Sequence, residues 1–155
     1  VGRISSASIR DGDNRLTPAN LEAALNASLR RLRTETIDLY QLHWPDRRVN
    51  NFGHLSYEHV EHEDAIPIEE TLAVLDGFVK AGKVRFIGVS NETAWGLSRF
   101  LHLAETRQLA RIQSIQNPYN LLNRSFDTAQ LSPPWLWQNG PKRQFLVYAL
   151  TLPRK

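Results

Sequence analysis

Apolar and polar residues along the chain follow two spacings, and these spacings predict its helices and strands. Leucines recur three to four residues apart over residues 18–33, which predicts an amphipathic helix. Thr17 is the expected N-cap of this helix, and Pro18 fits its first helical position. Residues 36–44 are rich in strand formers and stop at Pro45, which predicts a strand.

The same alternation of helix and strand continues after a polar connection at residues 46–65. Gly82 follows the next one-sided apolar pattern at the position where a left-handed C-terminal cap is expected. The later elements are predicted as helices over 67–82 and 93–107, strands over 84–89 and 112–116, and a candidate fourth strand over 144–150. Short apolar strands that alternate with amphipathic helices indicate a parallel sheet with helices packed outside it.

Polar residues stand at the C-terminal ends of three successive predicted strands. They are His43, the pair Ser90 and Asn91, and the pair Gln116 and Asn117. The alternation alone fits either a barrel or an open doubly wound sheet. The strand-end positions favour a (β/α)8 barrel, in which these ends share one face and form the active site. We therefore predict an α/β fold, a partial TIM barrel of about four of the eight strand–helix units.

Each strand end also has an explanation that involves no ligand. Alternation along residues 37–44 places His43 on one face with Gln41, and Tyr40 on the other face with Trp44. If the first face lines the barrel, His43 is its topmost inward residue, although a neighbouring carbonyl would satisfy it equally. The Ser-Asn pair resembles a helix cap, and the Gln-Asn pair resembles a turn. Together these uncharged groups indicate a site for a flat, amide-bearing ligand rather than a hydrolytic centre.

Composition narrows the chemistry further. The 155 residues carry a net charge of +3 and contain no cysteine, which excludes disulfides, thiolate zinc sites and cysteine nucleophiles. The basic residues lack an aromatic platform, and no apolar run is long enough to cross a bilayer, so we expect neither nucleic acid nor membrane as a partner. We expect a cytoplasmic protein. The chain starts with Val and contains no Met, which indicates a processed product or a piece.

The polar connection at residues 46–65 contains side chains that could bind a metal ion. His54, His59 and His62 lie there among acidic residues, and imidazole and carboxylate are metal donors. Nothing in their spacing defines a tetrahedral arrangement, so we predict a solvated acidic loop and no metal. The sequence contains no GxGxxG or Walker motif, so it gives no support for a Rossmann or P-loop nucleotide site.

Four runs of sequence closely resemble the aldo-keto reductase family, in its Tas-type branch, which is also similar to the potassium-channel β-subunits. They are "LEAALNASLRRL", "IDLYQLHWPDR", "AGKVRFIGVSNETAWG" and "IQNPYNLLNRSF", and they occur in family order and at family spacing. The resemblance covers about residues 10–127 and implies a (β/α)8 barrel. It also implies that NADPH reduces an aldehyde or ketone.

The resemblance assigns roles to individual residues. His43 would orient the substrate carbonyl, as one member of a tetrad with Tyr, Asp and Lys. Ser90, Asn91 and Gln116 would hold the carboxamide of the nicotinamide, and Tyr148 is the match for an aromatic residue that stacks on its ring. The other three tetrad residues belong to earlier strands of the family and have no match here. We therefore expect the chain itself to be inactive, the alternatives being a non-catalytic nucleotide- or partner-binding protein and a degenerate gene product.

The chain is expected to form one partial barrel domain, 1–155, in three parts: an entry loop over 1–16, a family-like core over 17–127 and a divergent tail over 128–155. Paired breakers, Pro133-Pro134 and Gly140-Pro141, interrupt the tail where a helix is due. A shifted reading frame would explain why the tail departs from the family. A half barrel leaves two unpaired sheet edges, so we predict self-association through them.

Overall fold

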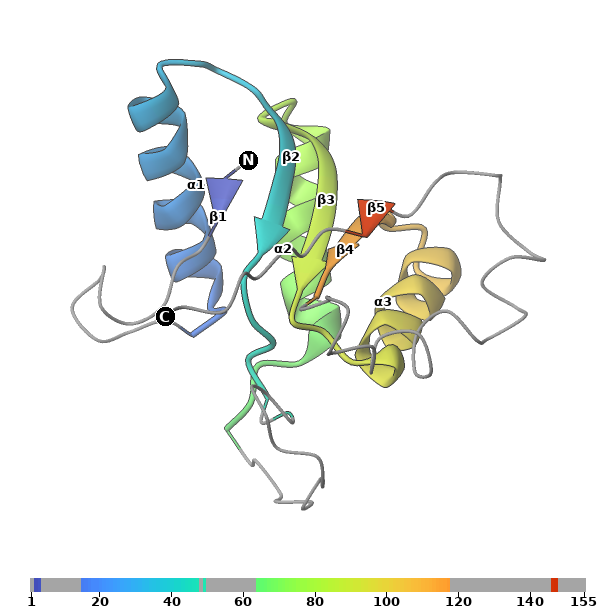
Figure 1. Cartoon of the computed structure of the whole chain (residues 1–155). Helices are drawn as coiled ribbons and strands as arrows, with labels where there is room; N and C mark the ends of the chain where they lie inside the picture. The colour runs from blue at the N-terminus through green and yellow to red at the C-terminus, as the bar shows by residue number, and fades with distance from the viewer. Residues whose placement is uncertain (1, 4–14, 48, 50–63, 118–145, 148–155) are drawn as a thin grey trace.

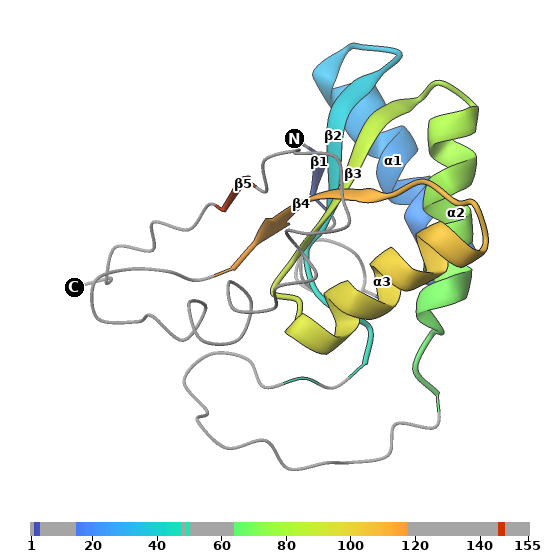
Figure 2. The same ribbon diagram turned by 90° about the vertical axis from the view of Figure 1, so that its right-hand side faces the viewer.

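The computed structural model describes residues 2–3, 15–47, 49, 64–117 and 146–147 (Figure 1). Its centre is a sheet of five parallel strands in the order β1-β2-β3-β4-β5. The strands are β1 (Gly2–Arg3), β2 (Ile37–Leu42), β3 (Val84–Ser90), β4 (Ile112–Gln116) and β5 (Leu146–Val147). The helices are α1 (Pro18–Leu32), α2 (Ile68–Lys80) and α3 (Ala94–Thr106), and they lie together on one side of the sheet (Figure 2).

Local signals explain where the helices begin and end. The Thr17 hydroxyl accepts a hydrogen bond from the Asn20 backbone N–H (3.3 Å), and the Thr93 hydroxyl accepts one from Gly96 (3.1 Å). Helix α2 has no side-chain cap, but Glu69 and Glu70 occupy its first turn, where negative charge is favourable. Gly82 has φ of +70°, which confirms the predicted left-handed turn after this helix.

Strand β2 and the entry segment differ from the prediction, and the predicted strand at 144–150 is described only in part. Strand β2 stops at Leu42 rather than at residue 44, because the His43 carbonyl accepts a hydrogen bond from the Asn91 side chain instead of a strand partner (2.8 Å). The entry segment was expected to be a loop, yet Gly2–Arg3 pairs with β2. Two residues are too few to show a period. Of the predicted strand at 144–150, Leu146–Val147 pairs with β4, and its other residues lie outside the described ranges.

The helix-facing side of the sheet carries the apolar core. Tyr40, Ile87 and Ile115 project to this side and are almost fully buried. The Tyr40 ring meets Phe78 of α2 edge to face, with centroids 6.2 Å apart, a favoured aromatic geometry. The expectation that Tyr40 faces the helices is confirmed.

The opposite side of the sheet, called the inner face below, carries a polar and narrow row. Gln41, Gly88 and Ser114 stand at matched positions on β2, β3 and β4, and Gln41 Nε2 donates to Ser114 Oγ (3.2 Å). A Cβ on Gly88 would collide with that hydroxyl, so only glycine fits there. An extra residue, Gln113, shifts the register between β3 and β4, which keeps Ser114 on the inner face.

Candidate functional site

The C-terminal ends of β2, β3 and β4 are tied together by hydrogen bonds. Asn91 reaches both neighbours: its Nδ2 donates to the His43 carbonyl (2.8 Å), and its backbone N–H donates to the Gln116 carbonyl (2.9 Å). The Ser90 hydroxyl donates to the same Gln116 carbonyl (2.8 Å). The structure thus brings four of the predicted site residues together at one rim, while Tyr148 lies outside the described residues.

Asn91 contacts both neighbouring strand ends, and its backbone conformation is unusual. Its φ is +55°, in the left-handed region, which asparagine adopts more readily than most residues with a side chain. Only Asn91, Glu92 and Thr93 separate β3 from α3, so the chain must turn sharply here. The Asn91 Nδ2 donates to the His43 carbonyl and also to the Ser90 hydroxyl (3.3 Å), and Oδ1 is the acceptor atom of this side chain.

His43 is fixed at its backbone by the Asn91 hydrogen bond, directly after the last residue of β2. Its ring packs against the Trp44 ring, with centroids 5.1 Å apart and a tilt of 55°. Both residues are half-buried. The imidazole is therefore anchored at the same rim as Ser90 and Gln116.

A buried ion pair, not foreseen from the sequence, lies beside Asn91. Glu92 is 3% exposed, and its carboxylate pairs with the Arg47 guanidinium and accepts the Thr93 N–H (2.6 Å). A Cβ on Gly96 would collide with both charged groups, so this glycine makes room for them. The motif "GVSNE" predicts a helix cap. It does not reveal that the Glu92 carboxylate pairs with Arg47, which is 45 residues away in the sequence. Only the fold reveals the pair.

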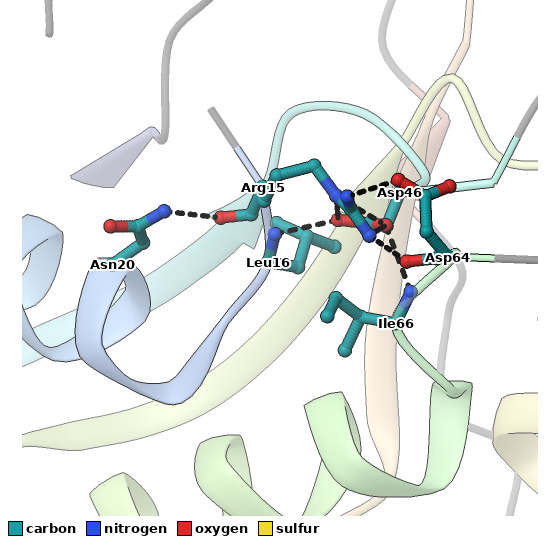
Figure 3. Close-up of polar contacts among 6 residues, drawn as sticks. All are labelled: Arg15, Leu16, Asn20, Asp46, Asp64 and Ile66. Carbon is teal, nitrogen blue, oxygen red and sulfur yellow. Dashed lines mark hydrogen bonds and ion pairs between the residues drawn. The ribbon is translucent and has the colours of Figure 1, made fainter. Parts of the chain in front are cut away.

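A second polar network surrounds Asp46 (Figure 3). The Asp46 side chain is 3% exposed and accepts hydrogen bonds from Arg15 Nε (3.0 Å), the Leu16 N–H (2.7 Å) and the Ile66 N–H (2.9 Å). Arg15 also pairs with Asp64 (2.8 Å). The network joins the start of α1, the end of β2 and the approach to α2, and it fixes both ends of the polar connection.

Arg15 remains charged in this network. The hydrogen bond with Asp46 raises the pKa of Arg15, against a smaller lowering by desolvation. A raised folded-state pKa stabilises the fold below the unfolded-state pKa, and this contribution is lost only as the pH rises through the folded value. The charge on Arg15 therefore persists at every pH at which an arginine is ordinarily protonated, and its role is structural.

A small cavity lies behind the rim, on the helix side of the sheet. Its volume is about 20 Å³, which is room for a water molecule rather than an organic ligand. Its walls include Leu42, Trp44, Thr71 and Phe100. This cavity is therefore too small for an organic ligand.

Two further classes of site were sought among the described residues. No helix there is long and apolar enough to cross a membrane. No group of three acidic, histidine or cysteine side chains in those ranges could bind a metal ion. The segment with His54, His59 and His62, weighed above as a metal site, lies outside them.

Comparison with known proteins identifies the class of protein. A sequence model described as "Aldo/keto reductase family" matches residues 7–140, most of the chain. The chain belongs to the aldo/keto reductase family. The match extends beyond residue 127, where the resemblance read from the sequence stops.

Individual relatives support this assignment. "Protein tas" of Escherichia coli K12 is 51% identical over 115 residues, which are 74% of this chain and 33% of that protein. An aldo-keto reductase of Babesia bovis is 41% identical over 124 residues, 76% of this chain and 44% of the relative. The chain thus spans a third to less than half of the length of these relatives.

Solved structures share its fold. The glycerol dehydrogenase AKR11B4 of Gluconobacter oxydans has a TM-score of 0.61 and 32% identity, over 86% of this chain and 32% of that one. A thermostable aldo-keto reductase solved with the inhibitor epalrestat has a TM-score of 0.55 and 31% identity, over 76% and 35% of the two chains. The parallel sheet with outer helices is part of a TIM barrel, as the sequence predicts.

Proposed function

We propose that this chain forms the nicotinamide-holding part of an NADPH-dependent reductase that converts aldehydes or ketones to alcohols. The observation that carries the proposal is the convergence of Ser90, Asn91 and Gln116 at one rim, with His43 anchored beside them. The family membership supports the reaction class, because the members found by comparison include reductases and a dehydrogenase by name.

The chemistry of the rim fits the carboxamide of a nicotinamide ring. A primary carboxamide both donates and accepts hydrogen bonds, so it needs partners of both kinds. Asn91 carries Oδ1 as an acceptor, the Ser90 hydroxyl has a second lone pair besides the one that accepts Asn91 Nδ2 (3.3 Å), and the Gln116 amide contains both a donor and an acceptor. NADPH would supply the hydride when bound, and these three residues would hold and orient its ring.

His43 would donate a hydrogen bond to the substrate carbonyl and so orient it for reduction. The family tetrad also needs a tyrosine acid, and general acid catalysis contributes about 10² to 10⁴ in rate. Tyr40, the one tyrosine among the described residues, is fully buried against Phe78 on the helix side. It cannot reach the rim, so we propose that the 155-residue chain turns over little or no substrate.

A second candidate function is a non-catalytic nucleotide-binding protein on the same scaffold. Its supporting observation is the same rim, where the described residues Ser90, Asn91 and Gln116 offer uncharged hydrogen-bonding groups. The complete reading frame distinguishes the two: a Tyr, Asp and Lys set on preceding strands supports the reductase, and its replacement supports the binding protein. For the reductase, we also propose that Tyr148 stacks on the nicotinamide ring. We further propose that the protein is cytoplasmic.

The cofactor proposal is tested by fluorescence titration of the chain with NADPH. Gln116→Ala should weaken binding about fivefold, the typical effect of losing one neutral hydrogen bond. Gln113→Ala is the matched control, since Gln113 lies on the same strand and its side chain bonds only the Arg111 carbonyl among the described residues (3.1 Å). Equal affinities for the two variants would contradict the proposed role of Gln116.

The expected inactivity has a separate test. The chain is mixed with NADPH and a nitrobenzaldehyde, and the nicotinamide absorbance is followed over time. We expect no enzyme-dependent decrease, because the described residues place no tyrosine at the rim. Sustained turnover would contradict this part of the proposal.

We also propose that the chain self-associates through its open sheet edges, since unpaired strand edges pair readily with another chain. Light scattering after size-exclusion chromatography should show a mass above the 17.8 kDa of one chain. A monomer at all concentrations would contradict it.

A further inference from the structure

The short turn from Asn91 to Thr93 holds a strained residue at the centre of the rim. A left-handed conformation in a residue with a side chain persists only where its surroundings enforce it. The contacts of Asn91 itself, to His43 and Gln116, fix two of its polar groups. They do not fix the residue that follows it, so another device must hold the turn.

Asn117 supplies that device from the end of β4. Its Oδ1 accepts the Glu92 N–H (3.1 Å), and its Nδ2 donates to the Glu92 carbonyl (2.8 Å). One carboxamide thus satisfies both backbone groups of a single residue. It links β3 and β4 beyond Ser90 and Gln116, the last pair of the backbone ladder.

The Glu92 side chain locks the same residue from the other direction. Its carboxylate accepts the Thr93 N–H at the start of α3, where negative charge is favourable. Arg47, which follows β2, donates to this carboxylate (3.2 Å to Oε2) and to the Thr93 hydroxyl (3.1 Å). Arg47 also lies over the Trp95 ring, 5.1 Å from its centroid, which restrains the guanidinium. The turn is therefore held between the ends of β2 and β4.

We propose that Asn117, Glu92 and Arg47 form a clasp that positions Asn91 and Ser90 for the cofactor. The inference rests on the proposed function for what the rim binds, but the clasp itself is a claim about the turn. None of the three needs to touch the cofactor. Each acts through the backbone of residues 91–93, so all three are positioning residues.

Amide hydrogen exchange tests the clasp in the chain without any ligand. Asn117→Ala should speed exchange of the Asn91 and Glu92 amides at least tenfold, because the turn is no longer pinned. The Ile87 amide, within β3, should be unaffected. Asn20→Ala is the matched control, since Asn20 also donates from a side-chain amide to a backbone carbonyl (Arg15, 3.1 Å) but far from the rim. Unchanged exchange at Asn91 would overturn the proposal.

Two further variants keep the test decisive. If Asn117→Ala does not fold, Asn117→Asp serves instead, because it retains the acceptor for the Glu92 N–H and replaces the donor with a negatively charged oxygen that repels the Glu92 carbonyl. Glu92→Gln retains an acceptor for the Thr93 N–H and loses the ion pair with Arg47, so its effect on Asn91 exchange should fall between those of the unsubstituted chain and Glu92→Ala. Equal exchange in both Glu92 variants and the unsubstituted chain would also overturn the clasp.

NADPH titration then links the clasp to binding. Asn117→Ala should weaken NADPH binding about tenfold without a matching loss of thermal stability, a difference that a merely structural role would not produce. Affinity that falls only in step with stability would overturn the positioning role. If the unsubstituted chain binds no NADPH, the proposed function is contradicted, and the exchange rates still decide whether the clasp exists.

Discussion

The two faces of the sheet are built on different principles. On the helix side, Tyr40, Ile87 and Ile115 are buried in one apolar core cluster. On the inner face, Gln41, Gly88 and Ser114 form a narrow polar row, and Phe86 is 48% exposed. The first face stabilises the fold, whereas the second is shaped for close approach and for polar contacts. The apolar core and the proposed binding site thus lie on opposite sides of a single layer of strands.

The largest test of this separation compares two phenylalanines. Phe78→Ala should cost about 3–5 kcal/mol in the free energy of unfolding, as is usual for a buried aromatic residue. Phe86→Ala removes the same atoms from a side chain that is 48% exposed and should cost about 1 kcal/mol, in proportion to its smaller burial. Urea unfolding followed by circular dichroism measures both. Equal losses would show that the two faces contribute alike to stability.

Two aspartates, one after the C-terminal end of β2 and one near its start, allow a second comparison of stability. Asp46→Asn, at the C-terminal end, should lower the urea midpoint clearly, because a buried carboxylate that joins three segments is lost. Asp38→Asn is the control near the start of the strand, where Asp38 pairs with Arg85 and both side chains are exposed. An exposed pair contributes about 0–1 kcal/mol, so the control should change little. A larger effect at Asp38 would be inconsistent with a tightly held rim.

Two Gly→Ala substitutions should change the stability of the fold in opposite directions. Gly88→Ala should destabilise the chain by about 1–3 kcal/mol, because its Cβ would push against Ser114 and Gln41 on the inner face. Gly77 lies in the last turn of α2 with open space around it, and Gly77→Ala should stabilise the chain by up to about 1 kcal/mol. Thermal unfolding measures both shifts. Stabilisation by Gly88→Ala would show that the side chains of β2 and β4 do not pack closely against Gly88 of β3.

Much of the fold was predictable because the signals of its elements are local. The spacing of leucines defines α1, Thr17 caps it, and the run at 112–116 matches β4 at both ends. The pairing of Gly2–Arg3 with β2 was not predictable, since two residues carry no period. The placement of His43, Ser90, Asn91 and Gln116 at strand ends could be inferred from topology, because parallel strands end at one rim.

The partners of those site residues could not be read from the sequence. Glu92 and Asn117 looked like cap and turn formers, and these local roles are compatible with the structure. Glu92 pairs with Arg47, 45 residues away, and Asn117 pairs with Glu92, 25 residues away. Such pairs depend on the register between strands, which the sequence does not reveal. Asp46 likewise follows a proline as a turn residue would, and only the fold shows it buried between α1 and α2.

The central claim is that the rim at the strand ends receives the nicotinamide of NADPH. Its most direct test is a nitrogen–proton NMR titration of the chain with NADPH, which reports each amide separately. The account predicts that the side-chain amides of Asn91 and Gln116 and the backbone amide of Ser90 shift together, while Val84 at the opposite end of β3 stays unchanged. Shifts that spare these three amides, or that fall at the Val84 end, would contradict it.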